Sequence, residues 1–72
     1  MNRLNYYQDL FSEFGWKTRW LDCDEGAVES TIARLRLKHK YNVNNLVISL
    51  AQQGIIEVLD IMDNVALQLY TH

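Results

Sequence analysis

The stretch ARLRLKHKYN, residues 33–42, alternates apolar or aromatic side chains with basic ones. It holds four of the seven Lys and Arg residues of the chain: Arg34, Arg36, Lys38 and Lys40. Because successive side chains of a β-strand point to opposite faces, a strand here would carry the four cations on one face. Its other face would carry Ala33, Leu35, Leu37, His39 and Tyr41. The pattern predicts a strand over residues 33–41, and the fold class depends on it.

The residues before this stretch indicate a helix followed by a strand. One face of a helix over about residues 3–14 would carry Leu4, Tyr7, Leu10, Phe11 and Phe14, with Gly15 as the residue that ends it. Residues 16–23, WKTRWLDC, are rich in aromatic and β-compatible side chains and predict a strand. The acidic turn DCDEG, residues 22–26, would connect it to the next strand as a hairpin.

The residues after the stretch indicate a helix and two further strands. Asn42 is a suitable N-cap and Gly54 a suitable stop for a helix with the apolar stripe Val43, Leu46, Val47, Leu50 and Ala51. IIEVLDI, residues 55–61, is typical of a buried strand, and VALQLYT, residues 65–71, alternates. The resulting order αββαββ predicts an α+β, ferredoxin-like sandwich, with a four-stranded antiparallel sheet and two helices on one of its faces.

A small all-α bundle is the alternative. Residues 24–40 fit a helix capped by Asp24 with an inward row of Val28, Ile32, Leu35 and His39, and residues 55–70 also have one apolar helical face. The helix over residues 24–40 would put Leu37 on its polar side, whereas the strand leaves only Ile32 without a place in the apolar row. We therefore prefer the sheet.

Composition indicates one globular domain over residues 1–72. Hydrophobic residues make up 49% of the chain, which is enough for a packed core. A net charge of −2 argues against a sequence-independent grip on phosphate backbones. Cys23 is the single cysteine, and we find neither a secretory signal nor an apolar run long enough to cross a membrane. We expect a cytoplasmic protein.

Enzymatic and metal-binding patterns are missing from the sequence. A nucleophile such as Cys23 or a serine would have only His39 and His72 as bases, and no phosphate-binding or dinucleotide motif occurs. The acidic turn lacks the ligand spacing of a calcium-binding EF-hand loop. We therefore expect no catalysis, no metal and no cofactor.

The basic row, defined as Arg34, Arg36, Lys38 and Lys40, is the candidate interaction site. Its first interpretation is a solvated strand face, its second a surface for an acidic protein, and its third a nucleic-acid site. A sheet that binds nucleic acid usually places stacking aromatics on the basic face. Tyr41 would lie on the opposite face, so nucleic acid ranks last.

A family resemblance supports the sheet. Its points of similarity are a helix ending in FG, a charged hairpin, RLRLKHKY, NNLVISLAQQ and the closing GIIEV. In these features the chain resembles the ACT-like cytosolic tail of MgtC/SapB-type and YhiD-type bacterial membrane proteins. The first strand of that family is missing, although VALQLYT could take its place, and no transmembrane part is present. The resemblance implies a regulatory or oligomerising module that pairs through its sheet and binds small ligands at the interface.

The leading hypothesis is a small non-catalytic regulatory or protein-interaction module that acts as a homodimer and binds a partner or small ligand. A stand-alone inhibitor or regulator, borne by a phage or plasmid and docking on a larger protein or nucleic-acid complex, is the alternative. A nucleic-acid binder that uses the basic row is the third hypothesis.

Overall fold

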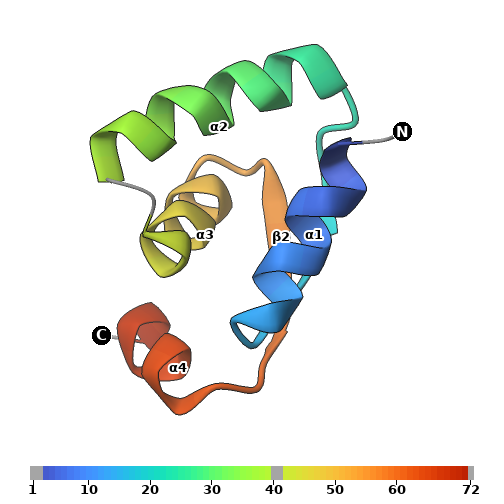
Figure 1. Ribbon diagram of the computed structural model, residues 1–72. Coiled ribbons are helices and arrows are strands. Elements are labelled where there is room, and N and C mark those ends of the chain that lie inside the picture. Colours follow the sequence, from blue (N-terminus) through green and yellow to red (C-terminus); the bar gives the residue numbers. More distant parts are fainter. Residues whose placement is uncertain (1–2, 40–41, 72) are drawn as a thin grey trace.

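The computed structural model describes residues 3–39 and 42–71. Within these ranges the chain forms four helices and two strands in the order α1, β1, α2, α3, β2, α4. Figure 1 shows α2 across one end of the molecule and α4 at the opposite end. The described residues form one two-stranded sheet, so the predicted four-stranded ferredoxin-like sandwich is wrong. The all-α alternative is also wrong, because both strands are present.

Helix α1 spans Arg3–Glu13 and confirms the helix predicted at the N-terminal end. Its inward side chains Leu4 and Phe11 are buried. Gly15 follows the helix with a φ of +91°, a conformation that side-chain-bearing residues rarely adopt. The same glycine accepts a backbone hydrogen bond of 2.7 Å from Met62, so the turn after α1 lies against the segment that precedes α4.

The sheet pairs β1, Trp16–Trp20, with β2, Ile56–Ile61, in antiparallel register. Both strands were predicted, although not as partners of each other. The inward cross-strand pairs are Trp16 with Ile61, Thr18 with Val58, and Trp20 with Ile56. The register shifts between Lys17 and Thr18, which leaves Leu59 as the extra residue of a bulge in β2.

Helix α2, Glu25–His39, replaces the strand predicted over residues 33–41, of which Lys40 and Tyr41 lie outside the described residues. Asp24 caps the helix as the all-α alternative expected, and its carboxylate accepts a hydrogen bond of 3.2 Å from the backbone N–H of Ala27. The buried row Val28, Ile32 and Leu35 has helical spacing. Leu37 is left 77% exposed. The strand prediction failed because it required Leu37 to be buried.

Helix α3, Val43–Gln52, confirms the helix predicted over residues 42–54. The Asn42 side chain accepts a hydrogen bond of 3.1 Å from the backbone N–H of Asn45, as expected of an N-cap. Gly54 lies just after the helix with a φ of +74°. Leu46, Val47 and Leu50 are the buried side chains of this helix.

Helix α4, Asn64–Thr71, occupies the segment predicted as the strand VALQLYT. The Asp63 carboxylate accepts hydrogen bonds from the backbone N–H groups of Val65, at 2.9 Å, and Ala66, at 3.1 Å. These bonds satisfy donors that a helix start leaves open, so Asp63 is an N-cap and not a turn residue between strands. The strand prediction is wrong because it relied on the alternation of apolar residues in VALQLYT and did not recognise Asp63 as a helix cap.

Trp16 lies at the centre of the core. Its side chain is fully buried, and its indole N–H donates a hydrogen bond of 2.8 Å to Asn44 of α3. Its ring meets Tyr70 of α4 edge-on, with 5.7 Å between the ring centroids. One residue of the sheet therefore contacts two helices that follow it in the chain.

We expect Gly15→Ala to destabilise the protein by at least about 1–2 kcal/mol, because alanine would have to adopt the positive φ of Gly15, which its Cβ disfavours. That Cβ would also lie 2.9 Å from the backbone nitrogen of Asp63. Urea denaturation measures the loss. Gly26→Ala is the matched control: Gly26 lies in α2, where a Cβ would be 3.7 Å from its nearest neighbour. An equal loss in both variants would contradict the close approach at Gly15.

We expect Asn44→Ala to lower the free energy of unfolding by about 1–3 kcal/mol, since it leaves the buried indole N–H of Trp16 without its acceptor. Asn45→Ala is the control, because Asn45 is exposed on the same helix. Thermal and urea unfolding of both variants check the difference. Two equally stable variants would show that the Trp16–Asn44 bond contributes nothing measurable.

Candidate functional site

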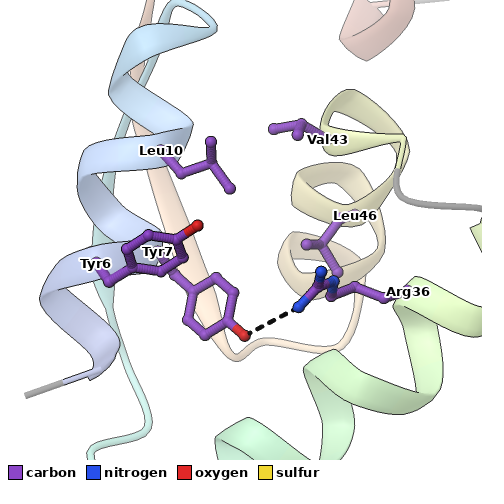
Figure 2. Close-up of a pocket in the computed structure, with 6 residues that line it drawn as sticks. All are labelled: Tyr6, Tyr7, Leu10, Arg36, Val43 and Leu46. Atoms are coloured by element: carbon purple, nitrogen blue, oxygen red, sulfur yellow. Dashed lines mark hydrogen bonds between the residues drawn. The ribbon is translucent and has the colours of Figure 1, made fainter.

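A pocket of about 190 Å³ opens where α1, α2 and α3 meet. Its lining residues come from all three helices: Tyr6, Tyr7 and Leu10 of α1, Arg36 of α2, and Val43 and Leu46 of α3. Figure 2 shows the Arg36 side chain reaching from α2 towards the space between the other two helices. The pocket is therefore built by packing α1 against α2 and α3, with Leu10 and Arg36 26 residues apart in the sequence, and no local motif reveals it.

The polar end of the pocket is formed by Arg36 and Tyr7. The guanidinium Nη1 of Arg36 donates a long hydrogen bond of 3.5 Å to the Tyr7 hydroxyl (Figure 2). The ring of Tyr6 packs edge-on against Tyr7 at a centroid distance of 5.3 Å, while the Tyr6 side chain stays 60% exposed. The pocket thus joins a cationic donor to two aromatic rings and an apolar wall.

The helical form of α2 splits the basic row. A step of two residues turns an α-helix by about 200°, so alternate residues do not share a face. Arg34 and Lys38, four residues apart, are exposed on the outer side of α2, whereas Arg36 is partly buried at the pocket. Lys40 lies outside the described residues. Because residues 34–38 are helical, Arg34, Arg36 and Lys38 do not form the line of cations that a strand would give, and a partner for the basic row stays a prediction.

Helix α4 carries a second candidate site, an apolar surface on the segment that was predicted as the alternating strand VALQLYT. Of this helix only Ala66 is buried. On one flank of Ala66, Val65 is 60% exposed and Leu69 is 45% exposed. On the other flank, Leu67 is 43% exposed and Tyr70 is 44% exposed. Together with Met62, which is 66% exposed, these four residues are called the α4 surface. An open hollow runs along Val65, Gln68, Leu69 and Thr71.

The aspartates of the acidic turn accept hydrogen bonds from nearby backbone N–H groups. The Asp22 carboxylate accepts a hydrogen bond of 2.9 Å from the backbone N–H of Asp24, whose own carboxylate caps α2. Cys23 between them is exposed. Across residues 3–39 and 42–71, no three His, Cys, Asp or Glu side chains come together in a way that could hold a metal ion. His72 lies outside the described residues.

Comparisons with protein-family models, with curated proteins and with solved structures give no match for this chain. The resemblance to the ACT-like tail of MgtC/SapB-type proteins therefore stays a prediction, and the sandwich fold that it implies is wrong for this chain. In the part of the chain that the structure describes, the helices are too short or too polar to cross a membrane.

Sequence reasoning missed both sites for different reasons. For the α4 surface a signal existed: Asp63 stands directly before the segment and could have been recognised as a helix cap. For the pocket the chain offers little, because Tyr7 looks like an ordinary member of the apolar helical face and Tyr6 is not part of that face. Arg36 was singled out, but as one cation in a row and not as the polar end of a pocket.

Proposed function

We propose that the protein is a non-catalytic protein-interaction module that acts as a homodimer through the α4 surface. The observation that supports this is the mismatch between the apolar character of α4 and its burial: Ala66 is buried, while Val65, Leu67, Leu69 and Tyr70 are all more than 40% exposed. An isolated helix of eight residues is marginal in water and depends on packing. A partner that covers the exposed flanks would supply that packing.

The size of the α4 surface fits an interface. Its five side chains together expose an area on the order of 500 Å², divided between the two flanks of Ala66, which is comparable to the largest apolar patch on typical monomers. A standard interface buries about 800 Å² on each partner, a little over half of it apolar. The α4 surface would supply that apolar share, and its neighbours would supply the polar rim.

The charge of α4 favours a second copy as the occupant. The helix, NVALQLYT, contains no ionisable group other than the Tyr70 phenol. In a twofold dimer a patch meets its own copy, so a charged patch would repel itself, whereas this one does not. The short chain adds to the argument, because small domains bury less of their surface and gain more from self-association.

A second candidate function uses the outer side of α2, where Leu37 is 77% exposed beside the exposed cations Arg34 and Lys38. In the described residues neither cation forms a salt bridge. A protein that docks here would need an acidic surface. This site ranks second because it offers a single large apolar side chain. We place either activity in the cytoplasm, where a free thiol such as that of exposed Cys23 stays reduced.

We expect sedimentation velocity to show a dimer at submillimolar concentration, and Val65→Lys or Leu69→Lys to weaken its association at least about 100-fold, because each buries an unpaired charge. Both positions are exposed, so the monomers should stay folded by circular dichroism. Leu37→Lys is the matched control and should leave the association unchanged. A wild-type chain that stays monomeric at millimolar concentration would refute the proposal. An equal effect of Leu37→Lys would move the interface to α2.

A further inference from the structure

We propose that the pocket between α1, α2 and α3 binds a small monocarboxylic acid with an aromatic or branched aliphatic body, and that Arg36 holds its carboxylate. This site shares no residue with the α4 surface, so the proposal goes beyond the dimerisation function. It depends on three features of the pocket: its size, its apolar walls and the position of its cation.

The size limits the ligand to a single ring or a short branched chain. Apolar protein cavities of about 150 Å³ accept benzene. At about 190 Å³ the pocket is somewhat larger than that, which leaves room for one carboxylate beside the ring. Nucleotides and larger cofactors are too large to be enclosed by it.

The walls suit an apolar body. Leu10 of α1 faces Val43 and Leu46 of α3 across the pocket, and the Tyr6 and Tyr7 rings form its floor on the α1 side (Figure 2). Leu46 is buried and Val43 partly buried, so the surface behind the ligand is part of the packed core. An aromatic ring would stack against tyrosine with the geometry that aromatic pairs prefer.

The polar end selects a carboxylate. Arg36 carries a planar guanidinium with five N–H donors, which matches the two oxygens of a carboxylate, and the Tyr7 hydroxyl beside it can donate as well. Of the described residues that line the pocket, none is acidic. Asp9 and Glu13 line a neighbouring hollow that shares Tyr6 and Leu10 with the pocket, and neither lines the pocket itself. Among the described lining residues, an anion in the pocket would therefore face the Arg36 guanidinium and the Tyr7 hydroxyl and no acidic side chain.

The carboxylate could belong to a free acid or to the C-terminal residue of a peptide, since both present the same group. Benzoate tests the first source and N-acetylphenylalanine the second, each against its uncharged amide, benzamide or N-acetylphenylalanine amide. Titration followed by ¹H–¹³C and ¹H–¹⁵N NMR reports both the affinity and the position of the ligand. We expect shifts of the Leu10, Val43 and Leu46 methyl signals.

We expect the carboxylate to bind at least about tenfold more tightly than its amide, the factor that loss of a charge-assisted hydrogen bond gives. Arg36→Gln should remove this preference, and Arg36→Lys should retain part of it. Arg34→Gln is the matched control, because Arg34 lies on the outer side of α2. The ¹H–¹⁵N spectrum of each variant shows whether it is folded.

Three results would overturn the proposal: no binding of either acid at tens of millimolar, equal binding of acid and amide, or an equal loss in Arg34→Gln. Binding of N-acetylphenylalanine without benzoate, still dependent on Arg36, would support the site and identify a chain terminus as its ligand. If Arg36→Gln fails to fold, the acid–amide comparison on the wild-type chain and the Arg36→Lys variant still decide the question.

Discussion

The burial of Trp16 in the paired strands is the constraint on which the remaining structure depends. Trp16 lies opposite Ile61 of β2, donates a hydrogen bond to Asn44 of α3 and packs edge-on against Tyr70 of α4. Burying a tryptophan of this size contributes roughly 4–6 kcal/mol by area, a large share of the stability of any small domain. Since β1 and β2 are separated by the whole α2–α3 segment, their pairing also closes that segment into a loop and packs it against the core.

Both proposed sites follow from how the helices attach to this centre. Helices α1, α2 and α3 pack on the core through buried side chains, and their meeting point leaves the pocket with Arg36 at its polar end. Helix α4 is the last element in the sequence. It is attached to the core by buried Ala66, by the contact of Tyr70 with Trp16 and by the Asp63 cap. Its apolar flanks, Val65 with Leu69 and Leu67 with Tyr70, remain largely exposed. A surface for self-association and a ligand pocket can therefore occupy separate regions of a very small protein.

The sequence predicted the parts of this fold in which one periodicity stands alone. The helical stripe around Leu46 and the cap Asn42 identify α3 in this way. In β2 the apolar run at residues 56–61 still identifies the strand, although a helical face also fits that segment. The prediction failed in other segments where two periodicities coexist. In α2 the apolar and basic residues around Leu35 do alternate, but the alternation does not decide which side chains are buried. The buried side chains follow the helical row Val28, Ile32 and Leu35, and Leu37 is exposed. Ala, Leu, Arg and Lys are strong helix formers, so local propensity should have outweighed the alternation. The pocket could not be predicted, because it exists only after α1 packs against the later helices α2 and α3.

The most direct test of this account is the network of nuclear Overhauser contacts in the folded chain, because it reports the strand pairing and the form of residues 25–39 at once. We expect cross-strand contacts between Lys17 and Asp60 and between Thr18 and Val58, together with sequential amide–amide contacts throughout α2. Cross-strand contacts from residues 33–39, with strong sequential Hα–amide contacts along them, would contradict it and restore the larger sheet.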